Sequence, residues 1–278
     1  MATDTSTTNF VPSAFRTIER LGVGTVFEVA LCRDALERDL ICKRAVDERF
    51  APALERERAV LALGLRPELP ELVAFGEDAR GGFLVETRAP GGPLRDLIDS
   101  RAPPGAAQWL ELARAATRAL AALHARGDAE GLRFVHGDIS PDNLFFEPPS
   151  TITFIDFSSA TWRDAPEPAL AGDRGTLPYA APELARQEVR ATDATDTYAL
   201  AATLLAVAVG PPLVRATTEA ARLFEVGSEG ILWKRIDERT DLAAELRSAL
   251  AEALQYDREH RLTSSSELAA RFGALSPR

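Results

Sequence analysis

The sequence predicts an α+β fold in two lobes, with a small antiparallel β-sheet and one helix followed by a larger, mainly α-helical part. Short extended runs separated by glycine-containing turns fill the first ninety residues. After the connector Pro90-Gly91-Gly92, apolar residues recur at the three- and four-residue steps of helices. We expect a disordered lead-in over residues 1–14, lobes over residues 15–89 and 90–278, and a ligand cleft between the lobes.

The elements of the first lobe follow from local pattern. Extended runs around glycine or charged turns indicate strands, and leucines at helical spacing after Pro52 indicate one helix. Strands are predicted at residues 17–21, 26–31, 39–44, 71–76 and 82–87, and the helix at residues 52–65. A hairpin turn centred near Glu37 would place Cys32 opposite Cys42 on paired strands. We expect both to be reduced thiols, because nothing in the sequence suggests export.

The second lobe is predicted to be helical around one small hairpin. A long amphipathic helix is expected at residues 106–124, with one apolar face made by Trp109, Leu112, Ala116, Leu120 and Leu123. The hairpin pairs residues 144–146 with residues 152–155, and further helices are expected at residues 193–209, 242–254 and 267–272. The last helix follows Ser264-Ser265-Ser266-Glu267, a capping-box pattern.

Composition excludes several classes of function. The net charge of −10 over 278 residues argues against a broad nucleic-acid surface, which needs clustered Lys and Arg. The longest apolar run, residues 198–209, is too short to span a membrane, and the first residues lack the features of a secretory signal. Three histidines without a close Cys or His neighbour make no zinc site. We therefore expect a cytoplasmic protein with no nucleic-acid partner and no membrane span, and leave its oligomeric state open.

The residues with the clearest chemistry lie in Val135-His136-Gly137-Asp138-Ile139-Ser140-Pro141-Asp142-Asn143 and at Asp156 downstream. Asp138 can accept a proton from a hydroxyl group. Asn143 and Asp156 have the side-chain types and spacing that hold a divalent cation beside phosphate groups. This set is what phosphoryl transfer requires, since catalysis of that reaction depends on positioning and on neutralising charge.

Together with residues in the first lobe, these motifs resemble those of the protein kinase family over residues 15 to about 271. By this resemblance, Gly22, Val23, Gly24 and Val29 form the loop that covers the nucleotide phosphates, although Phe27 stands where a third glycine is expected. Lys43 would contact the α- and β-phosphates of ATP.

The resemblance also implies how Lys43 is held and how adenine is bound. Glu57 on the following helix would pair with Lys43, and Glu55 is the nearby alternative. The backbone of Glu86 and Arg88 would hydrogen-bond adenine, and Val85 would line the back of the pocket.

In the second lobe the resemblance implies that Asp138 orients the acceptor hydroxyl and takes its proton, while Asn143 and Asp156 bind Mg²⁺. The segment 175–183 would receive a protein substrate, and its Thr176 would support Asp138 and accompany Ser/Thr acceptors. Three further residues would be structural: Glu183 paired with Arg261, and Asp196 anchoring the backbone of the catalytic loop.

Two departures from the family pattern affect function. Gly137 replaces an arginine that, in many members, contacts a phosphate on the activation segment, so control by such phosphorylation is expected to be weak or absent. Ser140 replaces a lysine that contacts the γ-phosphate. The loss of one charge-stabilising donor costs about 3 to 4 kcal/mol in comparable sites, so slow catalysis is expected.

Three functions therefore compete. The first is a Ser/Thr protein kinase that uses ATP and Mg²⁺ and acts on a protein substrate. The second is a pseudokinase, a nucleotide-binding regulatory scaffold, which the departures at Phe27 and Ser140 favour. The third is a small-molecule kinase of the aminoglycoside or choline type, whose pattern shares His136-Gly137-Asp138 but usually lacks the set formed by Glu183, Asp196 and Arg261.

Overall fold

The computed structural model of the protein describes residues 10–100, 103–165 and 175–274. The described residues divide into two compact units, with the boundary between Ala89 and Pro90. Each unit has its own sheet, and the two units are described separately below.

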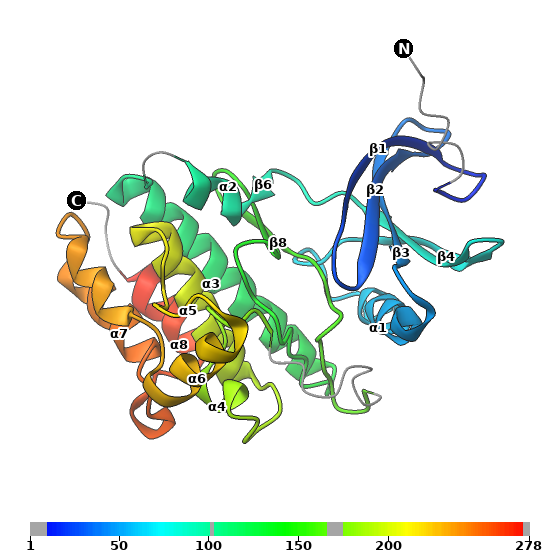
Figure 1. Cartoon of the computed structure of the whole chain (residues 1–278). Coiled ribbons are helices and arrows are strands. Elements are labelled where there is room, and N and C mark those ends of the chain that lie inside the picture. Colours follow the sequence, from blue (N-terminus) through cyan, green and yellow to red (C-terminus); the bar gives the residue numbers. More distant parts are fainter. Residues whose placement is uncertain (1–9, 101–102, 166–174, 275–278) are drawn as a thin grey trace, which may run out of the picture. The chain divides into compact units, whose positions relative to one another are not determined.

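The first unit is built on a five-stranded antiparallel sheet with one α-helix (Figure 1). In spatial order the strands are β1 (Arg16–Val23), β2 (Phe27–Arg33), β3 (Asp39–Ala45), β5 (Gly81–Thr87) and β4 (Leu72–Asp78). A short 3-10 helix, η2 (Glu48–Phe50), leads into α1 (Ala51–Ala62), which contacts β3, β4 and β5. Proline in the first turn of α1 suits its start, because the missing N–H would have no partner there.

The core on one face of this sheet extends into the segment before β1. Phe10 is fully buried and Val11 is 7% exposed, and both pack in a cluster with Ala30, Cys32, Leu40, Cys42 and Val85. The guanidinium group of Arg44 donates to the carbonyl oxygen of Phe10 at 2.6 Å. The prediction of a disordered lead-in is therefore wrong for residues 10–14, while residues 1–9 lie outside the described residues. Sequence pattern missed this because two apolar residues among serines and threonines form no periodicity.

The two cysteines lie in this core but are not opposite one another. Cys32 is in register with Leu40, and Cys42 with Ala30, so the two thiols are diagonal neighbours on one face. Both are free. The turn is centred one residue earlier than predicted because the carboxylate of Asp34 accepts from the backbone N–H groups of Leu36 and Arg38. Burial raises the pKa of Cys32 to about 11 and that of Cys42 to about 12.

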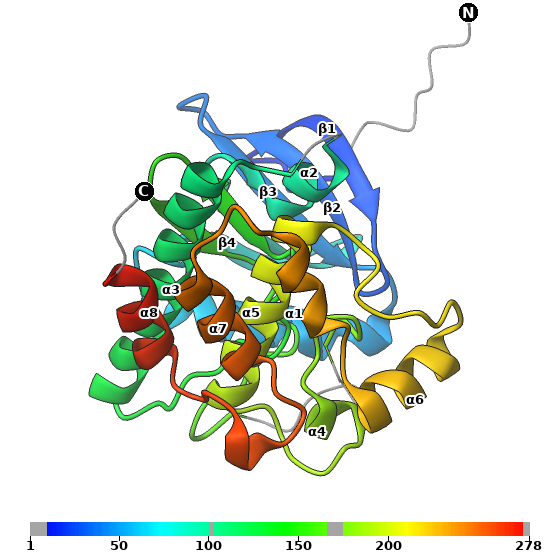
Figure 2. The same ribbon diagram turned by 90° about the vertical axis from the view of Figure 1, so that its left-hand side faces the viewer.

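The second unit combines a three-stranded sheet with a set of helices (Figures 1 and 2). The strands are β6 (Gly92–Pro93), β7 (Leu144–Glu147) and β8 (Thr151–Phe154). The α-helices are α2 (Leu94–Asp99), α3 (Ala106–Ala129), α4 (Pro182–Ala185), α5 (Asp193–Val209), α6 (Glu219–Glu229), α7 (Ala244–Ala253) and α8 (Ser265–Gly273). Two 3-10 helices, η3 (Trp233–Glu238) and η4 (Arg258–His260), complete the unit.

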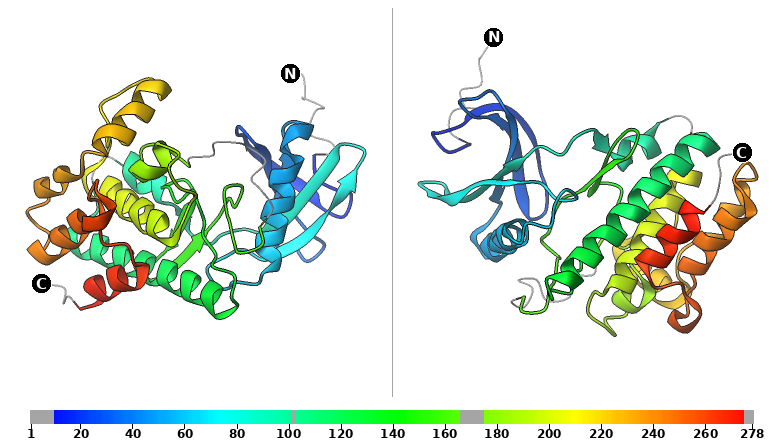
Figure 3. Two further views of the ribbon diagram at one scale, coloured as in Figure 1. Left: turned by 90° about the horizontal axis from the view of Figure 1, so that it is seen from below. Right: turned by 180° about the vertical axis from the view of Figure 1, so that it is seen from behind.

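Helix α5 is the centre of this unit. Every residue of α5 from Ala194 to Ala208 is buried, and α2, α3, α7 and α8 all contact it. Helix α3 runs alongside α8, as Figure 3 shows from behind. The rings of Trp109 and Phe272 are 5.9 Å apart. The hydroxyl of Ser264 accepts from the backbone N–H of Glu267 at the start of α8, as the capping pattern predicts.

The sequence located α3, α5, α7 and α8 and missed α2, α4 and α6. Helix α3 continues to Ala129, five residues beyond the predicted end. Helix α6 was not predicted, although Leu223 and Val226 lie one helical turn apart; only Val226 and Gly227 of its eleven residues are buried. Within the described residues, none of the helices has the length and apolar character that crossing a bilayer needs.

Candidate active site

In the first unit, the predicted lysine is buried between two carboxylates. Lys43 lies on β3 and is 5% exposed. Its Nζ contacts Oε1 of Glu57, which α1 delivers, and also Oε1 of Glu86 on β5 at 2.9 Å. Glu57 is fully buried, whereas Glu55 pairs with Arg58 at the surface, so Glu57 is the partner of Lys43. The second carboxylate was not predicted.

Strand register explains which side chains accompany Lys43. Val29 and Leu84 are its direct cross-strand neighbours, so their side chains and that of Lys43 share one face of the sheet. Glu86 lies two residues beyond Leu84 and points to the same face. Val85 points to the opposite face and is fully buried in the cluster with Cys42. The prediction that Val85 lines the pocket is therefore wrong, because alternate residues of a strand face opposite sides.

The two residues predicted to contact adenine, Glu86 and Arg88, differ in the position of their main chains. Glu86 lies on β5, in register with Ile41 of β3 on one side and Leu72 of β4 on the other. Its main chain is therefore within the sheet, and its side chain is engaged by Lys43. Arg88 follows the end of β5, where the main chain leaves the sheet, and its guanidinium group lies 3.6 Å from Asp39. The main chain of Arg88 therefore lies outside the strand pairing that holds the main chain of Glu86.

The predicted phosphate loop is the turn between β1 and β2. Gly22 and Val23 end β1, and the backbone N–H of Gly24 donates to the carbonyl oxygen of Phe27 at 2.8 Å. Val23 is 71% exposed. A Cβ placed on Gly22 would meet nothing within 4 Å, so packing does not require glycine there. The absence of a side chain leaves space on the exposed side of the turn, which suits the close approach of a ligand.

In the second unit, the backbone of the catalytic segment is anchored by a buried carboxylate at the start of α5. Asp196 is 1% exposed. It accepts from the backbone N–H groups of His136 at 2.8 Å and Gly137 at 2.9 Å, and from Nε2 of His124 at 3.0 Å. This is the backbone-anchoring contact that the resemblance implies for Asp196.

Asp138 is held by neighbours on both of its carboxylate oxygens. The backbone N–H of Thr176 donates to Oδ1 at 2.7 Å. The side-chain amide of Asn143 donates to Oδ2 at 3.2 Å and to the carbonyl oxygen of Asp138 at 3.0 Å. Thr176 thus supports Asp138 through its main chain. The carboxylate is fixed in orientation and only half-buried, as a proton acceptor needs to be.

Asp156 lies close to the same loop. It follows β8, and the backbone N–H of Ile155 donates to the carbonyl oxygen of Asn143 at 3.0 Å. Asp156 has φ of 62°, a left-handed conformation that aspartate tolerates better than most residues. Because Nδ2 of Asn143 donates to Asp138, the amide oxygen of Asn143 is the atom that can bind a cation. Within residues 10–100, 103–165 and 175–274, no group of three or more His, Cys, Asp or Glu side chains forms a metal site by itself.

Two glycines bring the surrounding loops into contact. Gly137 has φ of 83°, and a Cβ at this position would lie 2.4 Å from the carbonyl oxygen of Ser159. Gly175 has φ of 64°, and a Cβ there would lie 2.9 Å from the carbonyl oxygen of Gly137. The residue that replaces the family's arginine is therefore a position where this backbone accepts only glycine.

His136 is part of the core beneath these loops. It is fully buried, with its ring 5.2 Å from Phe157 and 5.8 Å from Phe154. Burial lowers the pKa of His136, and the nearby carboxylates of Asp196 and Asp156 oppose this shift. The lowered pKa favours the neutral ring, whose Nε2 lies 3.2 Å from the carbonyl oxygen of Ile155. Its position indicates a packing role.

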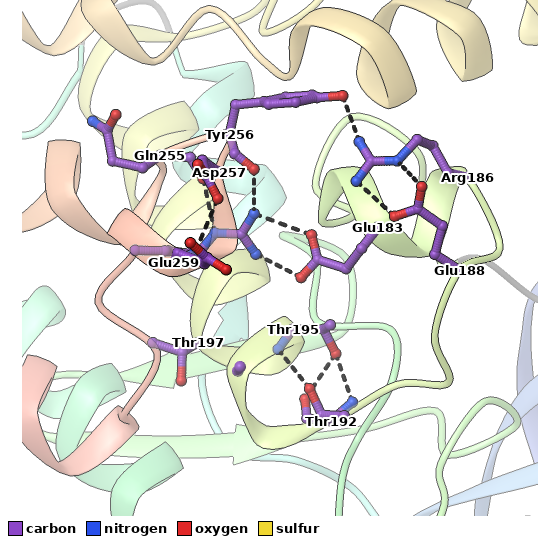
Figure 4. A network of polar contacts seen from close by, with 12 residues as sticks. Glu183, Arg186, Glu188, Thr192, Thr195, Thr197, Gln255, Tyr256, Asp257 and Glu259 are labelled. Carbon is purple, nitrogen blue, oxygen red and sulfur yellow. Dashed lines mark hydrogen bonds and ion pairs between the residues drawn. The ribbon is translucent and has the colours of Figure 1, made fainter.

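The predicted ion pair between Glu183 and Arg261 is present and bidentate. The two Arg261 nitrogens lie 2.6 and 3.0 Å from the Glu183 oxygens, and both side chains are buried. Figure 4 shows the carboxylate of Glu183 and, beside it, Arg186 reaching the hydroxyl of Tyr256. The guanidinium group of Arg261 also lies over the ring of Tyr198 on α5. This pair joins the segment that ends at Glu183 to the helical core.

Comparison with known proteins identifies the family. A model of the protein kinase domain matches residues 15–272. The chain belongs to the protein kinase family. Among curated relatives, serine/threonine-protein kinase PknD of Mycobacterium tuberculosis is 28% identical over 213 residues, which cover 73% of this chain and 30% of PknD. Serine/threonine-protein kinase PknL of Mycobacterium bovis is 29% identical over 184 residues, which cover 64% of this chain and 44% of PknL. The kinase chain thus spans less than half the length of these relatives.

A solved structure supports the fold assignment. The structure of Rad53 residues 1–466 in complex with AMP-PNP aligns with 93% of this kinase chain and 64% of that chain, with a TM-score of 0.71. Sequence identity in this alignment is 21%, so the likeness concerns the fold. The α+β kinase fold, with an antiparallel sheet in the first lobe and a helical second lobe, is confirmed.

Proposed function

We propose that this kinase-family chain transfers the γ-phosphoryl group of ATP to Ser or Thr hydroxyl groups of a protein substrate. The observation that carries the proposal is the fixed carboxylate of Asp138, held on one oxygen by Thr176 and on the other by Asn143. A carboxylate in this state can orient an acceptor hydroxyl and take its proton.

The residues fit an ATP·Mg²⁺ substrate. Asn143 and Asp156 offer one amide oxygen and one carboxylate on adjacent loops, and Mg²⁺ bound through so few protein ligands completes its shell with phosphate and water oxygens. When bound, Mg²⁺ would neutralise developing charge on the phosphate oxygens. Lys43 would contact the phosphates, the turn at Gly22 and Gly24 would cover them, and the main chain at Arg88 would meet adenine.

Ser140 sets an upper limit on the rate. It is 1% exposed and has no charge, so it cannot replace a cation at the transferring phosphoryl group. The loss of such a donor costs about 3 to 4 kcal/mol in comparable sites, which is a factor of about a few hundred in rate. We therefore propose slow catalysis.

The Ser/Thr class of acceptor rests on two supports. The curated relatives PknD and PknL bear the serine/threonine-protein kinase name. Thr176 occupies the position that, by family resemblance, accompanies Ser/Thr acceptors, and its main chain contacts Asp138.

A pseudokinase is the second candidate, and a specific observation favours it. Lys43 is engaged by two buried carboxylates, which weakens the cation available to phosphate. The small-molecule kinase alternative has less support, because the chain keeps the Glu183–Arg261 pair and the Asp196 anchor.

The experiment that tests the proposal is incubation of the purified chain with radiolabelled ATP, Mg²⁺ and a mixed protein acceptor, followed by phosphoamino-acid analysis. Label on phosphoserine and phosphothreonine, lost when EDTA is added, is the expected result. Nucleotide binding without any transfer would favour the pseudokinase, and transfer to choline or an aminoglycoside with no labelled protein would favour the third function.

A further inference from the structure

Glu86 is a buried carboxylate with no assigned role for its side chain. It is 2% exposed, and its Oε1 lies 2.9 Å from Nζ of Lys43. Its Oε2 is also buried and has no hydrogen-bond partner among the described residues. A buried carboxylate oxygen without a partner is costly to a fold, so the position calls for a functional explanation.

The contact between Glu86 and Lys43 is built into the sheet. Lys43 is in register with Leu84, and Ile41 with Glu86, on adjacent antiparallel strands. The pair therefore forms a diagonal contact on one face, whereas Glu57 reaches Lys43 from helix α1. Glu86 stays beside Lys43 for as long as β3 and β5 remain paired.

The two carboxylates change the charge that a ligand meets. One ammonium group and two carboxylates give Lys43, Glu57 and Glu86 together a net charge of −1 when all are ionised. The next residue along β3, Arg44, does not offset this charge, because its guanidinium group bonds to Asp78 and to backbone oxygens of the opposite face. An ammonium group has three N–H donors; Lys43 donates to Oε1 of Glu57, and Oε1 of Glu86 lies 2.9 Å from the same nitrogen.

We propose that Glu86 sets the nucleotide affinity of the kinase by competing with nucleotide phosphate for Lys43. This inference rests on the proposed function, in which Lys43 contacts phosphate. Each phosphate group that approaches Lys43 also meets the charge of Glu86 at a short distance in a medium of low dielectric constant. Affinity should therefore rise when the charge of Glu86 is removed, and the rise should grow with the number of phosphates.

The test is direct binding by isothermal titration calorimetry of adenosine, ADP and ATP, each with Mg²⁺, to the wild-type chain and to Glu86→Gln. Glutamine keeps the size and one acceptor and removes the charge. ATP is expected to bind the variant about tenfold more tightly or better, ADP by a smaller factor, and adenosine with unchanged affinity. Glu77→Gln is the matched control, because it removes one charge from an exposed position on β4 of the same sheet and should change none of the three affinities.

The outcomes separate this inference from the proposed function. Wild-type chain that binds none of the three ligands overturns the proposed function. Wild-type chain that binds ATP while Glu86→Gln binds it with equal or lower affinity overturns only the role of Glu86, as does an equal gain for adenosine and ATP.

Two further measurements keep the inference testable if Glu86→Gln does not fold. Glu86→Met replaces the charged contact by an apolar one of similar volume, a change that buried ion pairs often tolerate, and should give the same order of affinities. In the wild-type chain, the ratio of ATP affinity to adenosine affinity is expected to be below about ten, because the ammonium group of Lys43 is already paired with Glu57 and Glu86. A ratio above about a thousand would contradict competition at Lys43.

Discussion

Replacement of Gly137 by alanine tests the geometry of the catalytic loop quantitatively. The left-handed φ of 83° costs a non-glycine residue about 1 to 2 kcal/mol. The new Cβ would also lie 2.4 Å from the backbone oxygen of Ser159. Either the loop that contains Gly137 or the loop that contains Ser159 must then move, which costs about 1 to 3 kcal/mol more. We expect Gly137→Ala to lower the free energy of unfolding of the second unit by about 2 to 5 kcal/mol. Arginine at position 137 would have the same unfavourable φ and the same close contact between its Cβ and Ser159.

The assay is urea unfolding followed by tryptophan fluorescence, which reports on the second unit because all three tryptophans, Trp109, Trp162 and Trp233, lie in it. Gly131→Ala is the matched control. Gly131 has φ of 69°, but the nearest atom to its Cβ would be the end of a flexible arginine side chain at 3.4 Å. The free energy of unfolding of Gly131→Ala should fall only by the cost of the left-handed backbone conformation, about 1 to 2 kcal/mol. Equal losses for the two variants, or a Gly137→Ala protein as stable as wild type, would refute the close approach to Ser159.

Three further predictions concern buried polar groups. Asp196→Asn should lower the free energy of unfolding in the same urea assay by about 2 to 4 kcal/mol, since an amide cannot accept from both loop N–H groups and His124 as the carboxylate does; a loss below about 0.5 kcal/mol would contradict the anchoring role. Because the pKa of His136 is lowered on folding, the unfolded chain takes up the proton first, so stability should be complete above about pH 6.5 and decline as the pH falls below it. His136→Asn should flatten that decline in unfolding curves measured between pH 7 and 5, and an unchanged slope would exclude His136 as its source. Since burial raises the pKa of Cys32 to about 11 and of Cys42 to about 12, both thiols should react slowly with a disulfide reagent at pH 8 and rapidly in denaturant, whereas rapid reaction of the native protein would contradict their burial.

The part of the site that could be predicted from sequence is the part that is local in the chain. Asp138 and Asn143 are five residues apart on one loop, and that spacing is itself the motif. The structure brings these two within hydrogen-bond distance. The contacts of Glu183 with Arg261, and of Asp196 with the loop backbone, span 78 and about 60 residues. They were accessible only through family resemblance, because residue pattern contains no information on such distant pairs.

The prediction for Val85 was wrong, and the contact of Glu86 with Lys43 was missed, because a shift of one residue along a strand moves a side chain to the opposite face of the sheet. Val85 and Glu86 are adjacent in sequence, but one faces the core with Cys42 and the other faces Lys43. Leu84, Val85 and Glu86 are all buried, so alternation of apolar and polar residues does not tell which face each one occupies. Knowledge that Lys43 pairs with Leu84 would have placed Glu86 beside the lysine, but these two residues are 41 positions apart in the sequence.

The central claim is that Asp138 acts on the acceptor hydroxyl, and the rate of phosphoryl transfer in a single turnover tests it most directly. The wild-type chain, loaded with radiolabelled ATP and Mg²⁺ and mixed with a protein acceptor, is compared with Asp138→Asn and with Asp164→Asn, which alters an exposed acid of the same unit. We expect slow but measurable transfer by the wild type and by Asp164→Asn, and a rate at least about a hundredfold lower for Asp138→Asn with ATP binding retained. Equal rates for wild type and Asp138→Asn would contradict it.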